Sequence, residues 1–292
     1  MTGRPSEAIP RRGGGSVQIS VIIFTLNEEI HLPSCLAALR WADDIIIVDS
    51  FSRDRTEAIA SEHGARFFQN QFAGFGSQRN WALDHCAPKH DWILILDADE
   101  RVTPELAEEI GIVIDAEPAD VGAFRVKRRF YMWGRWLQYS SLYPNWVVRL
   151  IHRDRVRYVD RGHAETQTVQ GKVLELQSDL IDENLRSIDE WFDRQNRYAS
   201  KEAAYELANE ATGGGFGDLV SRDPLIRRAA LKRLSWRLPL RPVFYFLYAY
   251  LWRAGFRDGR SGLMFCFMKA LYQGMIVVKK YDMRQAADRH RT

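Results

Sequence analysis

The sequence lacks features that mark several common protein classes. Its three cysteines, Cys35, Cys86 and Cys266, form no CxxC pair, so a disulfide scaffold or a cysteine zinc site is not expected and a reducing compartment fits. The formal net charge is only +3, so the overall charge says little about partners. We expect no nucleic-acid partner. No apolar stretch of the signal-peptide kind opens the chain, so residues 1–16 predict a flexible polar tail.

Two nucleotide-binding signatures are also missing. No GxxxxGK[ST] phosphate loop occurs anywhere in the chain. The run Gly13-Gly14-Gly15 precedes an apolar segment instead of following one, and Gly74-x-Gly76 lacks the third glycine of a dinucleotide fingerprint. These absences argue against a P-loop enzyme and against hydride transfer from a dinucleotide.

The first half of the chain alternates short apolar runs with helical patterns. The apolar runs predict buried strands over residues 17–26, 45–48, 65–68 and 92–96. Helices are expected over residues 27–40, 54–64 and 76–84 and from Thr103 onward, where a hydroxyl cap precedes proline and an acid. This alternation predicts an α/β sandwich, in which ligands bind at the carboxyl ends of the strands.

The fourth apolar run ends in Asp97-Ala98-Asp99, the most informative motif of the sequence. Carboxylate oxygens are preferred ligands of Mg²⁺ and Mn²⁺, which in turn bind the oxygens of a diphosphate. Such an ion would neutralise the charge that develops as a nucleoside diphosphate leaves. We therefore expect Asp99 and Asp97 to hold a metal ion. The alternative is an acidic cluster that merely precedes the helix beginning at Thr103.

Polar residues follow the other expected strands as well. Asp49 ends the second strand and is placed to accept hydrogen bonds from a base, while Asn27 and Glu28 follow the first. Asn and Glu at these positions are equally typical of a helix N-terminus. The expected nucleotide-binding residues are Thr25, Asn27, Glu28, Asp49, Ser52, Arg79, Asp97 and Ala98.

A second candidate site lies in the segment from Asp160 to Glu165. Displacement of a nucleoside diphosphate by an acceptor hydroxyl needs a general base. We expect Glu165 to be that base, with Asp160 as the second choice and His163 orienting the carboxylate or binding metal. A surface turn with scattered charges is the alternative. Arg125, Arg128, Arg149 and Trp146 are candidates for the acceptor side.

The last third of the chain has a different character. Residues 222–241 interleave arginine and lysine with apolar residues, which is the pattern of a basic amphipathic helix. The apolar run 243–252 is too short to span a bilayer, and Lys269 and Gln273 interrupt the run 262–278. We expect residues 211–292 to form a basic, aromatic helical region that associates with a membrane surface; a helical lobe with a basic rim is the alternative.

Several of these segments together resemble the GT-A glycosyltransferases of family 2. The resemblance is carried by ISVIIFTLNEE, IIIVDSFSRDRT, FAGFGSQRNWAL, LDADE and WVVRLIHRD, and GFRDGRSG is similar to the bacterial lipopolysaccharide-core β-glucosyltransferase-like branch. That branch commonly has His directly before Glu, whereas this chain has His163-Ala164-Glu165. The resemblance implies a GT-A catalytic domain over residues 17–210, a UDP-sugar donor and an inverting reaction.

The sequence thus predicts a metal-dependent hexosyltransferase that uses Mg²⁺ or Mn²⁺. The acceptor expected from the resemblance is lipid-linked or a lipopolysaccharide or polysaccharide, and the expected location is the cytoplasmic face of the bacterial inner membrane. Whether the protein forms a homo-oligomer stays open. The alternative function is a non-catalytic nucleotide-sugar-binding subunit of a polysaccharide assembly complex.

Overall fold

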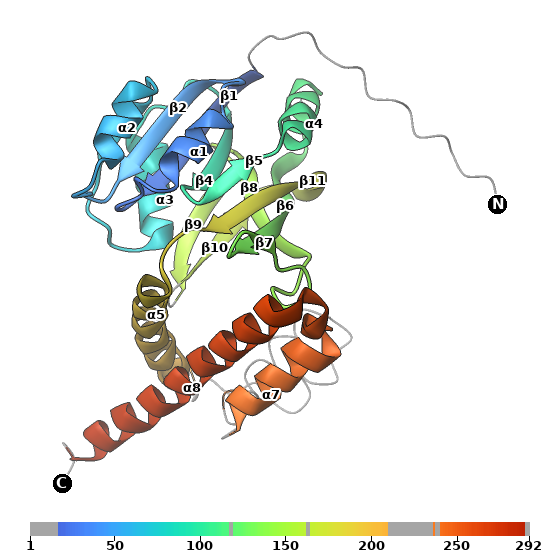
Figure 1. Ribbon diagram of the computed structural model, residues 1–292. Coiled ribbons are helices and arrows are strands. Elements are labelled where there is room, and N and C mark those ends of the chain that lie inside the picture. The colour runs from blue at the N-terminus through green and yellow to red at the C-terminus, as the bar shows by residue number, and fades with distance from the viewer. Residues whose placement is uncertain (1–16, 117–118, 162–163, 210–235, 237–239, 290–292) are drawn as a thin grey trace.

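The computed structural model describes residues 17–116, 119–161, 164–209, 236 and 240–289. The tail expected over residues 1–16, most of the basic stretch 222–241, and His163 lie outside the described residues. The described residues form one large sheet with helices on its faces, a separate two-stranded sheet, and a group of helices beside the large sheet (Figure 1).

The strands and helices follow in the order shown in Figure 1. The strands are β1 (Val17–Thr25), β2 (Ala42–Asp49), β3 (Arg66–Gln69), β4 (Trp92–Asp97), β5 (Glu100–Val102), β6 (Val121–Met132), β7 (Arg135–Trp136), β8 (Asn145–His152), β9 (Val156–Arg161), β10 (Ala164–Val169) and β11 (Lys172–Asn184). The helices are α1 (Leu32–Ala37), α2 (Thr56–Glu62), α3 (Phe75–His85), α4 (Pro104–Asp115), α5 (Ile188–Asn209), α7 (Arg241–Leu247) and α8 (Gly259–Arg289), with a π-helix, η2 (Tyr248–Trp252), and a 3-10 helix, η3 (Gly255–Asp258).

The large sheet has the strand order β3-β2-β1-β4-β8-β6-β11-β5, with β7 paired to β6. The four expected strands are confirmed as β1 to β4, and they are mutually parallel. Beyond β4 the sheet is mixed, because β8 runs antiparallel to both β4 and β6 and β5 runs antiparallel to β11. The expected α/β sandwich with a C-terminal helical region is confirmed.

The register of the parallel strands lines up their carboxyl ends. Thr25 of β1 pairs with Asp49 of β2, and Phe24 pairs with Asp97 of β4. The strand interiors are β-branched or leucine side chains such as Ile23 and Leu96, which are fully buried between the helical layers. Burial therefore fixes the register, and the register brings polar residues far apart in sequence to one edge.

The first helix is shorter than expected. A helix was expected over residues 27–40, but α1 begins only at Leu32. Asn27 has a φ of 55°, in the left-handed region, which is incompatible with the first turn of a right-handed helix. The helix expected at Thr103 is confirmed, because the Thr103 hydroxyl accepts a hydrogen bond of 3.2 Å from the backbone N–H of Leu106.

The helices α5, α7 and α8 lie together beside the carboxyl edge of the sheet (Figure 1). One face of α8, including Phe265 and Ile276, packs with residues of α5. Asp258 in the GFRDGRSG segment accepts hydrogen bonds from the backbone N–H groups of Tyr139 and Ser140, which ties the helices to the loop between β7 and β8. The domain division after residue 210 stays a prediction.

Candidate active site

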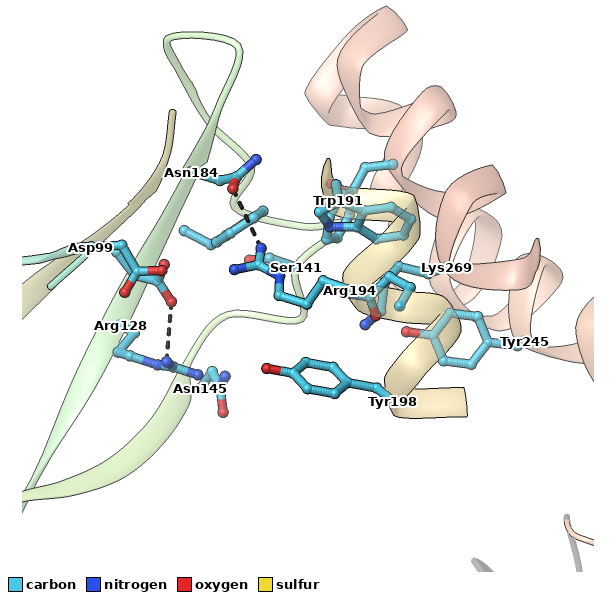
Figure 2. A pocket seen from close by; sticks show the side chains of 15 residues that line it. Asp99, Arg128, Ser141, Asn145, Asn184, Trp191, Arg194, Tyr198, Tyr245 and Lys269 are labelled. Carbon is cyan, nitrogen blue, oxygen red and sulfur yellow. Dashed lines mark hydrogen bonds and ion pairs between the residues drawn. The ribbon is translucent and has the colours of Figure 1, made fainter. Parts of the chain in front are cut away.

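A pocket opens between the carboxyl edge of the sheet and the helical region (Figure 2). The sheet and its loops contribute Asp99, Arg128, Phe130, Ser140, Ser141, Asn145, Asp182 and Asn184, and the helices contribute Trp191, Arg194, Gln195, Tyr198, Tyr245, Phe265 and Lys269. Asp99 stands at the turn between β4 and β5, so the motif singled out from the sequence lies at this pocket.

The two aspartates of the motif have different surroundings. Asp97 forms ion pairs with Arg149 at 2.5 Å and with Arg79 at 3.2 Å. Burial opposes ionisation of Asp97, but the charges of these two arginines outweigh it and lower its pKa to about 2. Asp99 has no such arginine partner among the described residues and lines the pocket. The geometry therefore favours Asp99 over Asp97 as a metal ligand.

Asp97 belongs to a row of alternating acids and arginines that we call the charge row. Its members in order are Glu165, Arg79, Asp97, Arg149, Glu100, Arg128 and Asp182, and consecutive members are 2.5 to 3.4 Å apart. Glu100 is fully buried, and the side chain of Arg149 is 6% exposed. Buried charges are tolerated only when they are paired, so the charge row fixes the side chains behind the pocket.

Negative charge is in excess where the charge row meets the pocket. With Asp99 added, five carboxyl groups share three guanidinium groups, a formal excess of two. Burial and then the charges of Asp182, Asp97 and Glu100 raise the pKa of Asp99 well above its usual range. Burial and neighbouring acids likewise raise the pKa of Asp182 to about 6. A divalent cation would match this excess.

The carboxylates at the pocket fit a metal ion that arrives already bound to the diphosphate of the sugar donor. Among the described residues, no three His, Cys, Asp or Glu side chains converge as a complete metal site. A Mg²⁺ or Mn²⁺ ion bound to a diphosphate needs only one or two protein carboxylates, because phosphate oxygens and water complete its coordination. Asp99, with Asp182 beside it, meets that requirement.

Thr25, Asp49 and Ser52 form one hydrogen-bonded group at the sheet edge. The Thr25 hydroxyl donates to Asp49 Oδ1 at 2.8 Å, and the backbone N–H of Ser52 donates to Asp49 Oδ2 at 2.7 Å. Asp49 is fully buried, so in this state its carboxylate organises the loop after β2 and presents no atom to solvent. The expected contact between Asp49 and a base stays a prediction.

Asn27 and Glu28 hold the loop after β1 against neighbouring segments. The Asn27 side chain accepts a hydrogen bond of 2.8 Å from the backbone N–H of Arg53. Glu28 forms an ion pair of 2.7 Å with Arg186 and contacts His31 at the same distance. These contacts join the first two strand ends to the loop before α5, and the nucleotide-binding role expected for both residues stays a prediction. Ala98, also expected there, is 3% exposed and packs in the core.

Arg79 connects the expected general base, Glu165, to the aspartate motif. It lies in α3, is 3% exposed, and its Nη1 is 3.3 Å from Glu165 Oε1 in β10. Its guanidinium also lies over the rings of Phe24 and Tyr158. Its buried Nε has no hydrogen-bond partner among the described residues. Arg79 thus orients Glu165, whose side chain is 17% exposed.

Asp160, the second candidate base, is engaged at the start of α3. Its carboxylate accepts hydrogen bonds from the backbone N–H groups of Gly76, at 2.7 Å, and Ser77, at 3.1 Å, and from the Ser77 hydroxyl. Burial opposes ionisation, but these hydrogen bonds outweigh it and lower the pKa of Asp160. A carboxylate stabilised in this way is a weak proton acceptor, so the geometry favours Glu165.

Four residues of the site were not recognised in the sequence: Glu100, Asp182, Arg194 and Lys269. Glu100 belongs to the LDADE run and could have been suspected from it, but the others lie on β11, α5 and α8, far from any motif. Of the arginines expected on the acceptor side, Arg128 does line the pocket and Arg149 lies behind it in the charge row. Arg125 forms an ion pair with Glu175 instead, and lies over the Trp146 ring.

Comparison with known proteins identifies relatives across the chain. The model of the family "Glycosyl transferase family 2" matches residues 20–171. The lipopolysaccharide core biosynthesis glycosyltransferase LpsC of Rhizobium meliloti (strain 1021) is 28% identical over 278 residues, covering 90% of this chain and 92% of the relative. An uncharacterised glycosyltransferase of Rickettsia typhi is 25% identical over 271 residues, covering 87% of this chain and 85% of the relative.

Solved structures with similar chain traces are more distant. S. aureus TarS 1-349 has 14% identity and a TM-score of 0.42, with 92% of each chain covered. The glucosyl-3-phosphoglycerate synthase of Mycobacterium tuberculosis has 16% identity and a TM-score of 0.41, covering 65% of this chain and 80% of that chain.

Proposed function

Because the chain belongs to glycosyltransferase family 2, we propose that it transfers a hexose from a UDP-sugar to a lipid-linked or lipopolysaccharide acceptor. The observation that carries the proposal is the formal excess of two negative charges in the charge row taken together with Asp99, of which Asp99 and Asp182 face the pocket. That excess is suited to a divalent cation bound to the donor diphosphate. The acceptor class is supported by the similarity to LpsC along nearly the whole chain.

The residues have distinct roles in the proposed reaction. A Mg²⁺ or Mn²⁺ ion would stabilise the charge on the departing diphosphate. Asp99, with Asp182, would bind it, while the charge row keeps Asp97 fixed at the end of β4. Thr25, Asn27, Glu28, Asp49, Ser52, Arg79, Asp97 and Ala98 would form or support the nucleotide-sugar site.

Glu165 would act as the general base. It accepts the proton of the acceptor hydroxyl while that oxygen bonds to the anomeric carbon and the bond from carbon to diphosphate oxygen breaks. The electron pair of that bond leaves with UDP, and a single displacement of this kind inverts the anomeric centre. The pairing with Arg79 supports this role, because it holds Glu165 in one orientation beside the charge row.

The helical region would place the enzyme on a membrane surface. Thirteen large hydrophobic side chains between residues 240 and 281 are exposed, and Trp252 is exposed by 83%. Among the described residues one helix, Gly255–Arg289, is long and apolar enough to cross a membrane. However, one face of α8 packs on α5, and Lys280 of α8 forms an ion pair of 2.9 Å with Glu206 of α5. We therefore propose that α7 and α8 lie in the interface of the cytoplasmic leaflet without crossing it.

The function is tested by a donor screen. UDP-, GDP- and dTDP-sugars are incubated with the protein and Mn²⁺ or Mg²⁺, and release of the nucleoside diphosphate is measured with and without chelator. We expect metal-dependent hydrolysis of a UDP-sugar that is lost in Asp99→Asn and retained in Asp154→Asn, a control at an exposed aspartate outside the site. Nucleotide binding without hydrolysis or transfer would refute the enzymatic role and favour a binding subunit.

A further inference from the structure

The pocket has a basic end opposite its acidic end. Arg194 of α5 and Lys269 of α8 both line it, on the side formed by the helices (Figure 2). Asp99 and Asp182 lie on the side formed by the sheet, where Arg128 pairs with Asp182 at 3.1 Å. The expected metal ion at the acidic end would offset the charge of the donor diphosphate, so the two cations at the opposite end fit a second anion.

These two half-buried cations have no carboxylate partner among the described residues. The hydrogen bond found for Arg194 is a long one, 3.4 Å from Nη2 to Asn184 Oδ1. Lys269 Nζ lies 5.3 Å from the centre of the Tyr272 ring and makes no hydrogen bond within the described residues. Most donors on both groups are therefore uncommitted.

The positive charges of Arg194 and Lys269 repel each other. Burial, and then the charge of Arg194, lowers the pKa of Lys269. Two like charges removed from water cost free energy unless an anion offsets them. Asn184, which is 6% exposed, also lines the pocket, and its amide nitrogen has no partner among the described residues. An oxyanion between the helices would satisfy these groups through charge-assisted hydrogen bonds.

We propose that the basic end of the pocket binds an anionic substituent, a phosphate or a carboxylate, carried by the acceptor sugar. The proposal rests on the proposed transferase function and adds the chemical class of the acceptor. Arg194 would provide the directional hydrogen bonds and Lys269 the point charge. The helix that carries Lys269, α8, also has exposed apolar side chains such as Phe267 and Leu271. An anionic sugar on a lipid carrier would enter from that side.

The test measures binding of three sugars by isothermal titration calorimetry with UDP and Mn²⁺ present: glucose 6-phosphate, glucuronate and glucose. We expect at least one of the two acids to bind more tightly than glucose. Arg194→Gln and Lys269→Gln should each weaken binding of that acid roughly 10- to 100-fold, as for loss of a charge-assisted hydrogen bond, and should leave glucose binding unchanged. Arg197→Gln, an exposed position on the same helix, is the matched control and should change neither.

The pattern of results identifies the anion. Preference for glucose 6-phosphate alone assigns a phosphate, and preference for glucuronate alone assigns a carboxylate. Equal binding of all three sugars, absence of binding by both acids, or an acid preference that survives in both variants would overturn the proposal. Wild-type preference for an acid is measured without any variant, so a folding defect in one substitution does not remove the test.

Donor hydrolysis measured without acceptor distinguishes failure of the anion site from failure of the proposed transferase function. The wild type and the Arg197→Gln control should both show metal-dependent hydrolysis of the UDP-sugar, because Arg197 does not line the pocket. Hydrolysis in the wild type without any acid preference would refute the anion site alone. Absence of hydrolysis in the wild type would count against the transferase function itself.

Discussion

The two aspartates of the Asp-x-Asp motif should respond differently to the same substitution. Asp97→Asn removes one carboxylate from between Arg149 and Arg79, whose side chains are 6% and 4% exposed. Loss of one partner from a buried ion pair costs about 3–5 kcal/mol. The Asp97 side chain is 37% exposed and Arg149 keeps Glu100 at 2.7 Å, so solvent screening and the remaining pair reduce the expected loss to about 2 kcal/mol.

Asp99→Asn should not destabilise the protein in the absence of metal. Burial and the neighbouring acids raise the pKa of Asp99 and so disfavour its charged form, and asparagine is close in shape to a neutral carboxyl group. The expected change in the free energy of unfolding is within about 1 kcal/mol of zero. The substitution should nevertheless abolish stabilisation by Mn²⁺ and a UDP-sugar, because it removes the metal ligand.

The assay is thermal unfolding followed by circular dichroism, with and without Mn²⁺ and UDP. A loss of about 2 kcal/mol corresponds to a fall in Tm of about 3 °C for Asp97→Asn in a chain of 292 residues. Asp99→Asn should unfold near the wild-type Tm but show no upward shift when Mn²⁺ and UDP are added. If both variants lose stability equally, or if Asp99→Asn keeps the full ligand-induced shift, the assignment of separate roles is wrong.

Three further predictions address the base, the acidic pair and the membrane face. Glu165→Gln should lower kcat roughly 10²- to 10⁴-fold in steady-state transfer assays. Asp160→Asn should mainly lower the free energy of unfolding, by about 1 kcal/mol in thermal melts, because the start of α3 loses its hydrogen-bond acceptor. A wild-type kcat in Glu165→Gln would show that another carboxylate is the general base. The pKa of Asp182 is raised to about 6, so the stability contributed by its protonated form is lost as pH rises through 6. In metal-free urea unfolding, the free energy of unfolding of Asp182→Asn should therefore rise by about 1–3 kcal/mol relative to that of the wild type between pH 5 and pH 7.5. Parallel pH profiles of the two proteins would contradict this. Leu251→Gln should weaken binding to anionic lipid vesicles, measured by sedimentation, about tenfold. The control Leu174→Gln, at an exposed leucine of β11 outside the helical region, should leave this binding unchanged. An equal effect of both substitutions would count against the membrane face.

The outline of the fold could be predicted because it depends on local patterns. Four apolar runs are strands in the structure, and the hydroxyl-proline-acid sequence at Thr103 begins a helix. Such patterns reflect burial and backbone capping, which act over a few residues. The helix expected from residue 27 began later, because the left-handed backbone of Asn27 is set by contacts with Ser52 and Arg53 on another loop.

The pocket could be predicted only in part. Its acidic edge follows from a motif, but its opposite wall comes from α5 and α8, where Arg194 and Lys269 occur in ordinary helical contexts. A single arginine or lysine in a helix is usually a solvated surface residue. Only the packing of α8 on α5 reveals that these two are half-buried and face a pocket.

The sequence by itself determined the order of strands and helices in the first half of the chain, the family, and the position of Asp97-Ala98-Asp99 at the end of a buried strand. It could not decide which aspartate is free to bind metal, because the two residues are chemically identical and their surroundings come from distant segments. Arg149 lies 52 residues from Asp97 in the chain, and Asp182 reaches Asp99 from β11. Electrostatic interactions act through space, so the tertiary structure alone made one aspartate an ion-pair partner and left the other facing the pocket.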